Sequence, residues 1–157
     1  MSKRLILALG GILVFVAVGL AGCGGSDDED ATASSITKAE FIKQADEVCR
    51  EGEKRVQKDF DAYVKENEDL KEPTDADYAA LVAAVLAPNA ERETEQLREL
   101  GAPDGDEEQI EAMLEAREQG LKDAEARPKA VVTSGEDIFA GASKIATDYG
   151  LKVCGYP

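Results

Sequence analysis

The chain has 157 residues, enough for one domain once a leader is set aside, and a formal net charge of −15. Such a charge repels phosphate backbones and anionic lipid surfaces, so the composition argues against nucleic-acid binding and against direct adsorption of the domain to a bilayer. Histidine is absent, which removes the commonest general base and zinc ligand and leaves any chemistry to carboxylates, lysine, tyrosine, serine and threonine.

The first 22 residues have the layout of a secretory signal. Lys3 and Arg4 precede the apolar stretch LILALGGILVFVAVGL at 5–20. A transmembrane helix is the alternative, because residues 5–22, about eighteen in all, are just enough to cross ~30 Å of hydrocarbon. The residues that end the stretch decide in favour of the signal.

Leu20-Ala21-Gly22-Cys23 resembles the lipobox of bacterial lipoproteins, in which a branched apolar residue and two small residues precede a cysteine. The resemblance implies cleavage between Gly22 and Cys23 by a type II signal peptidase and acylation of Cys23, for example with palmitate. Two or more acyl chains anchor a protein permanently, at ~0.8 kcal/mol per buried methylene. The mature chain would lie on the extracytoplasmic face of the bacterial cell membrane. Its formal charge would be −17, because Lys3 and Arg4 leave with the leader.

Residues 23–36 are expected to be a lipidated cysteine followed by a disordered acidic tether. The segment GGSDDEDATASS at 24–35 has no large apolar residue, so it cannot offset the entropy lost on ordering. The acid run at 27–30 could be a cation site, but a solvated spacer is the preferred interpretation. The folded domain is therefore predicted to span 37–157.

The first predicted helix begins after Thr37 and runs to about residue 70. Thr37 with Glu40 matches a capping box, and Ile36 with Phe41 matches a hydrophobic staple. A stripe of apolar or small residues follows at steps of three and four: Phe41, Ala45, Val48, Cys49, Gly52, Val56, Phe60 and Tyr63. The stripe predicts a long helix with one buried face.

A second helix is predicted over about 74–100, with Thr74 and Asp77 as its capping box. Pro88 lies inside it, so we expect a kink, because proline removes one backbone donor and clashes with the carbonyl four residues earlier. A kink can open a ligand pocket, which would suit a sensor, but more often it only bends the helix around its core.

Two further helices complete the predicted domain. The acids at 104–108 do not fit an EF-hand loop and suit the positive end of the third helix, which ends before Pro128. Its inward face comprises Ile110, Met113, Leu114, Arg117 and Leu121. Thr133 or Ser134 is expected to cap the last helix, and Gly150 to end it. That helix presents Ile138, Phe139, Ala142, Ile145 and Tyr149.

No segment alternates as a strand would, so the predicted fold is all-α, a four-helix up-down-up-down bundle with a long first helix. Cys49 and Cys154 form an even pair once Cys23 carries lipid, in an oxidising compartment, and antiparallel first and last helices would bring them together. We therefore expect a disulfide, with two buried thiols as the alternative. A redox-active role is disfavoured because the sequence has no C-x-x-C motif.

The mature part resembles small, uncharacterised helical lipoproteins of high-GC Gram-positive bacteria, through KAEFIKQADEVC at 38–49 and YGLKVCG at 149–155. The resemblance implies no activity, and no catalytic residue, cofactor or metal site is predicted. The expected function is a non-enzymatic, membrane-anchored binding or structural module for an envelope protein, a cell-wall component or a small solute. The alternative is a carboxylate-dependent cell-envelope hydrolase, which a cleft with two buried acids of raised pKa would favour.

Overall fold

The computed structural model describes residues 36–69 and 71–155. The signal, the cleavage position at Gly22 and Cys23, and nearly all of the tether lie outside the described residues. Every regular element in the described ranges is a helix, and Cys49 is bonded to Cys154, so the all-α fold and the disulfide are confirmed. None of the described helices combines the length and the apolar character that a membrane crossing requires.

Helix α1 (Lys38–Glu66) begins as predicted and ends slightly early. Its capping box is complete, because Thr37 Oγ1 accepts a hydrogen bond from the Glu40 N–H at 3.3 Å and Glu40 Oε2 accepts one from the Thr37 N–H at 3.1 Å. The first half of the predicted stripe is buried, namely Phe41, Ala45, Cys49 and Gly52. Farther along, Phe60 is 40 % exposed. The apolar stripe therefore packs over only part of the length of α1.

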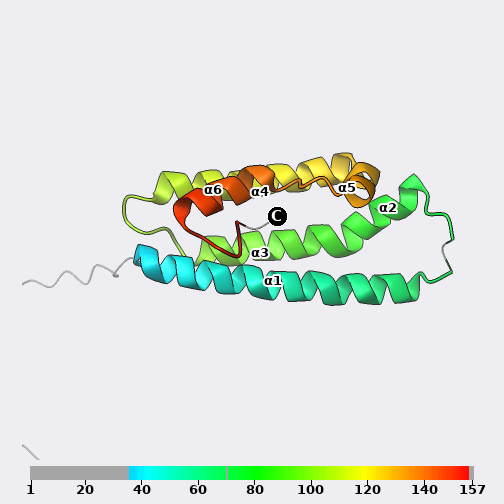
Figure 1. Cartoon of the computed structure of the whole chain (residues 1–157), viewed down its shortest axis with the longest axis horizontal. Coiled ribbons are helices and arrows are strands. Elements are labelled where there is room, and N and C mark those ends of the chain that lie inside the picture. Colours follow the sequence, from blue (N-terminus) through cyan, green and yellow to red (C-terminus); the bar gives the residue numbers. More distant parts are fainter. Residues whose placement is uncertain (1–35, 70, 156–157) are drawn as a thin grey trace, which may run out of the picture. The chain divides into compact units, whose positions relative to one another are not determined.

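The second predicted helix is one continuous helical run in three parts: α2 (Asp75–Leu81), the π-helix η1 (Val82–Leu86) and α3 (Ala87–Glu99). The wider turn comes just before Pro88, and the N–H of Ala87 bonds to the carbonyl of Val82, five residues back. Because Pro88 has no N–H to donate and its ring crowds the preceding turn, the π turn accommodates it. Figure 1 shows α2 inclined to α3, as expected for a helix bent near this proline.

The C-terminal third differs from the prediction. Helix α4 (Glu107–Ala126) ends before Pro128, but α5 (Pro128–Ser134) follows at once and α6 (Ala140–Tyr149) is separate. Thr133 and Ser134 therefore end α5 instead of capping the last helix. Pro128 starts α5 because a proline at the first helical position loses no hydrogen bond, and Gly135 ends it at a φ of 66°. Ile138 and Phe139 lie in the turn before α6.

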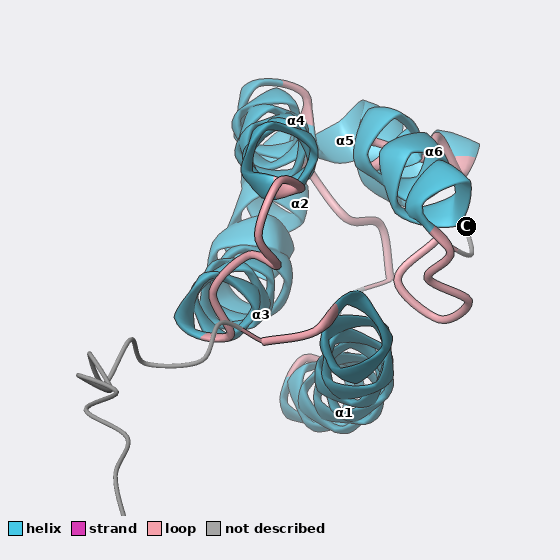
Figure 2. Ribbon diagram, turned by 90° about the vertical axis from the view of Figure 1, so that its left-hand side faces the viewer, coloured by secondary structure: helices cyan, strands magenta, loops and turns pink. Residues whose placement is uncertain are grey.

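The helices pack side by side around one apolar core (Figures 1 and 2). Helix α1 lies against α3, α3 against α4, and α4 against α6, while α2 packs on α5. The largest core residues include Phe41, Leu97, Met113, Leu114, Tyr149 and Leu151. The rings of Phe41 and Tyr149 meet edge to face with centroids 5.7 Å apart. Burial of each such side chain contributes ~1.5–3 kcal/mol, so apolar packing is the main stabilising term.

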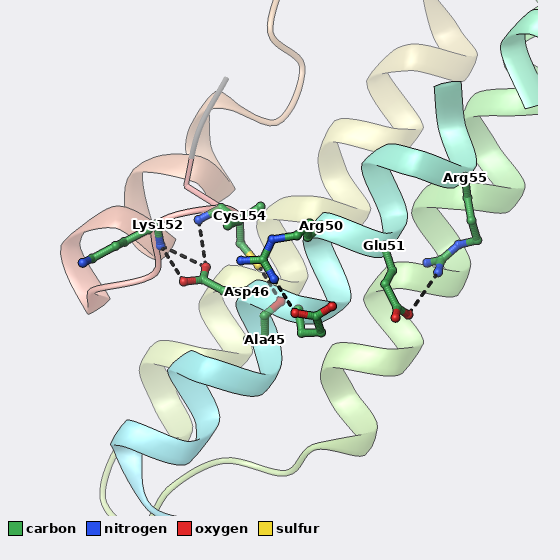
Figure 3. A network of polar contacts seen from close by, with 9 residues as sticks. Ala45, Asp46, Arg50, Glu51, Arg55, Lys152 and Cys154 are labelled. Atoms are coloured by element: carbon green, nitrogen blue, oxygen red, sulfur yellow. Dashed lines mark hydrogen bonds and ion pairs between the residues drawn. The ribbon is translucent and has the colours of Figure 1, made fainter. Parts of the chain in front are cut away.

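The C-terminal turn is held against α1 by the disulfide and by one carboxylate (Figure 3). Asp46 Oδ1 accepts hydrogen bonds from the backbone N–H groups of Lys152 at 2.9 Å and Val153 at 2.8 Å. The Cα atoms of Cys49 and Cys154 are 5.3 Å apart. These contacts hold residues 152–154 beside α1, and two of them, Val153 and Cys154, line the groove described next.

Candidate functional site

A groove of about 730 Å³ lies beside the disulfide, and we call it the disulfide groove. It is lined by residues of α1, η1, α3, α4 and the two C-terminal turns: Cys49, Glu53, Val56, Gln57, Leu86, Ala90, Glu93, Arg117, Asp137, Phe139, Val153 and Cys154. Small-molecule sites commonly enclose roughly 300–1,000 Å³ and combine apolar walls with a few polar groups. The disulfide groove has both properties.

A buried ion pair lies on the wall of this groove. Arg117 Nη2 donates to Glu93 Oε1 at 2.6 Å, and Arg117 Nε donates to the hydroxyl of Thr94 at 3.2 Å. The side chains of Arg117 and Glu93 are only 9 % and 13 % exposed. Taking two charges out of water costs several kcal/mol per ion, and apolar residues of similar volume often stabilise a core as well or better. The pair is therefore poorly explained by stability alone.

Gly52 on α1 provides the space for the Glu93 carboxylate. A Cβ atom at position 52 would lie 2.8 Å from Glu93 Cδ and closer still to Oε2. Real Cβ atoms do not approach so closely, because protein interiors are packed to van der Waals distances. The absence of a side chain on α1 is thus a condition for the carboxylate of α3 to sit where it meets the guanidinium of α4.

Burial raises the pKa of the Glu93 carboxyl above its ordinary value of 4.5, while the charges of Arg117 and Arg55 act in the opposite direction. Arg55 approaches from α1 and donates to Gln96 Oε1 on α3 at 3.0 Å. Glu53 and Asp137 also line the groove but are exposed. With all groups ionised, three carboxylates and one guanidinium give the lining a formal charge of −2.

Phe139 forms a flank of the groove, and a glycine on α4 allows it to do so. The Arg117 Cζ atom lies 5.4 Å from the centroid of the Phe139 ring, within the range of a cation–π contact. A Cβ atom at Gly120 would lie 2.8 Å from Phe139 Cδ1 and closer still to the carbonyl oxygen of Ile138. The turn before α6 therefore packs directly on the α4 backbone, which places the ring next to Arg117.

A second, smaller groove of about 280 Å³ lies where α1 meets α2 and α5. Its lining includes Phe60, Tyr63, Val64, Tyr78, Leu81 and Val132. Phe60 and Val64 are 40 % and 49 % exposed, so this surface is apolar and open. Nothing among the described residues covers it, and it lacks the buried charges of the disulfide groove.

Only some of the site residues predicted from the sequence line the disulfide groove. Cys49 and Cys154 are brought together as predicted and line the groove, whereas Cys23 and Gly22 lie outside the described residues. Arg117 is predicted on the inward face of the third helix, and no role is predicted for Glu93. Two sequence features could have indicated the ion pair. One is Arg117 on the inward face of the third predicted helix, and the other is Gly52 in the apolar stripe of the first.

The carboxyl groups that line the groove differ in their surroundings. Two-carboxylate hydrolysis needs an acid and a second carboxylate about 5–10 Å apart across the scissile bond. Here the one buried carboxyl, Glu93, is already paired with Arg117, and the other acids that line the groove are exposed. No group of three or more side chains suited to a metal ion occurs within residues 36–69 and 71–155.

No family model matches the chain, and none of the curated proteins or solved structures compared with it matches either.

Proposed function

We propose that the chain is a membrane-anchored extracytoplasmic lipoprotein whose helical domain binds a small solute in the disulfide groove. Leu20-Ala21-Gly22-Cys23 supports the anchor, and the Cys49–Cys154 disulfide is consistent with an oxidising compartment. The observation that carries the binding role is the Glu93–Arg117 pair, whose side chains are only 13 % and 9 % exposed yet lie on the wall of a groove.

A ligand site gives the buried pair a purpose that packing does not. Charged groups fixed in advance in a partly dry groove act more strongly on a ligand than the same groups in water, because less solvent screens them. Their positions are set by contacts from three helices: the space left at Gly52, the hydroxyl of Thr94 and the guanidinium of Arg117. Such preorganisation reduces the cost of ordering that binding otherwise incurs.

The finer architecture is part of the same proposal. We propose one up-down-up-down four-helix bundle, in which α2, η1 and α3 together are the second helix and α5 with α6 the fourth. The order of packing, α1 on α3, α3 on α4 and α4 on α6, supports this topology. The disulfide that joins α1 to the segment after α6 supports it as well.

The anchor is tested by replacing Cys23 with serine in the precursor. Labelled palmitate should enter the wild-type protein and the Cys154→Ser control, but not the Cys23→Ser variant, which should leave the membrane fraction. Protease added to cells without their wall should digest the wild-type domain. Equal labelling of Cys23→Ser, or native protein in the cytosol with residues 1–22 attached, would refute the anchor.

The binding role is tested by filling the groove. Ala90 lines it, so Ala90→Trp should block it without changing any charge, whereas Ala80→Trp on the exposed face of α2 is the matched control. Ligand-observed NMR with a library of small amines, carboxylates, sugars and neutral compounds should find a class that binds the wild type and Ala80→Trp but not Ala90→Trp. If no class shows that pattern, the groove is not a binding site.

A carboxylate-dependent cell-envelope hydrolase is the second candidate, and the raised pKa of Glu93 is the observation in its favour, since a general acid must hold its proton near neutral pH. The wild type would then hydrolyse nitrophenyl glycosides or esters, and Glu93→Gln would lose that activity while remaining folded. Equal rates for the two proteins would remove this candidate.

A further inference from the structure

We infer that the disulfide groove takes an organic cation, a primary ammonium group carried on an apolar body. The inference rests on the proposed function and names the chemical class of the ligand for that site.

The charge of the lining disfavours an anionic ligand. The groove carries a formal charge of −2 from Glu53, Glu93 and Asp137 against Arg117, so an anionic ligand is repelled. The charge of Arg117 is included in that sum, and its Nη2 and Nε groups are already bonded to Glu93 and Thr94. A ligand with one or two positive charges would offset the negative charge.

The Glu93 carboxylate retains an acceptor for such a cation. Its Oε1 accepts from Arg117, and within the described residues no donor is bonded to Oε2. Glu53 and Gln57 line the same groove from α1, where a spacing of four residues puts both on one helix face. An ammonium group has three N–H donors to share among acceptors of this kind.

The rest of the lining calls for an apolar body instead of a bare ion. Val56, Leu86, Ala90, Phe139 and Val153 supply aliphatic and aromatic surface, together with the disulfide. A metal ion would leave that apolar surface in contact with water and most of the groove volume of about 730 Å³ filled with water. Covering it contributes roughly 25 cal/mol per Å² of apolar area removed from solvent.

Calorimetric titration of three isosteric probes tests the class: 4-phenylbutylammonium, 4-phenylbutanol and 4-phenylbutyrate, each against the mature chain (23–157) carrying Cys23→Ser. The ammonium should bind at least about tenfold more tightly than the alcohol, and the carboxylate should not bind; about tenfold corresponds to ~1.4 kcal/mol. Ala90→Trp should abolish binding of the ammonium.

Two matched variants separate the effect of charge at the groove on binding from the effect of the net charge of the whole protein. Glu93→Gln should weaken ammonium binding at least about tenfold, whereas Glu91→Gln, which makes the same change in net charge on an exposed position of α3 outside this groove, should leave it unchanged. Glu53→Gln, at an exposed position on α1, provides the second site variant if Glu93→Gln does not fold.

Equal weakening by the Glu91 and Glu93 variants would show unspecific attraction to an acidic protein and overturn the inference. Lack of ammonium binding to the wild type would overturn it too. Binding of the carboxylate, or binding of the alcohol as tight as that of the ammonium, would refute the cation and, if Ala90→Trp abolishes it, leave the proposed function standing. The proposed function itself would be refuted if, in the NMR experiment described above, no class of compound bound the wild type and Ala80→Trp but not Ala90→Trp.

Discussion

Replacing Gly52 by alanine tests whether the buried ion pair depends on the missing Cβ atom. The substitution should help α1, because glycine inside a helix is about 1 kcal/mol less favourable than alanine. The new methyl group, however, needs the space of the Glu93 carboxylate, with Cδ only 2.8 Å away. Displacing the carboxylate breaks a charge-assisted hydrogen bond to Arg117 worth ~1.5–3 kcal/mol. The net effect should be a destabilisation of about 0.5–2 kcal/mol.

Gly141 on α6 is the matched control. It lies in a helix and is exposed, and the nearest atom to a Cβ there is Ala116 Cβ at 4.0 Å, an ordinary contact. Because Gly141 lies in the first turn of α6, where propensity counts for less than in the interior, Gly141→Ala should stabilise the domain by up to roughly 0.5 kcal/mol. Opposite signs for two identical substitutions would isolate the effect of the carboxylate.

A double-mutant cycle with Glu93→Ala completes the measurement. Once the Glu93 side chain is gone, Gly52→Ala meets no obstacle and should be stabilising by about 1 kcal/mol, giving a coupling energy of roughly 1.5–3 kcal/mol. Free energies of unfolding come from urea titrations of the oxidised mature chain carrying Cys23→Ser, with equal m-values required across the set. If Gly52→Ala stabilises the parent protein as much as Gly141→Ala does, the reasoning on the ion pair is wrong.

Cys154→Ser should lower the free energy of unfolding by ~2–5 kcal/mol, because the bond closes a sequence separation of 105 residues; reductant should destabilise the wild type equally in urea titrations and leave the variant unchanged. Asp46→Ala should cost about 1–2 kcal/mol and speed amide exchange at Lys152 and Val153, whose N–H groups it releases. The Glu93 carboxyl should stabilise the fold less as pH rises. Its folded pKa lies above 4.5, so its stabilising contribution is fully present below about pH 4.5 and is lost as pH rises through the folded pKa. The stability of the wild type relative to Glu93→Gln should therefore fall between pH 4 and 7 in urea titrations, and a rise would contradict the assigned direction.

Local signals predicted the starts of α1 and α2 and a kink at Pro88. The capping boxes at Thr37 and Thr74 are confirmed because each is decided within four residues by bonds between a side chain and nearby N–H groups. The disulfide between Cys49 and Cys154 is a long-range contact, yet parity and the expected packing of the first and last helices were enough to predict it.

The boundary of the last helix could not be predicted in the same way. Pro128 is predicted only to end a helix, although proline at a first helical position is equally favourable, and the structure uses it as a start. Thr133 and Ser134 have the chemistry of N-terminal caps, but here their hydroxyls bond backward to carbonyls of α5, at Lys129 and Ala130. Which role they take depends on Gly135, which ends α5.

The candidate site could not be predicted from the sequence, because each of its residues also fits the ordinary pattern of a helix with one buried face. Gly52 continues the stripe of α1 as a small residue, and Arg117 continues that of α4 because the stems of long side chains pack on apolar surfaces. Together, the two residues indicate more than either does alone. Gly52 leaves space on one helix, and Arg117 places a positive charge on the inward face of another, so a carboxylate from a third helix can fit between them. That third partner, Glu93, comes from α3, which contacts both. Periodicity within one helix carries no information about that meeting, so the pair can be read only once the packing order of α1, α3 and α4 is known.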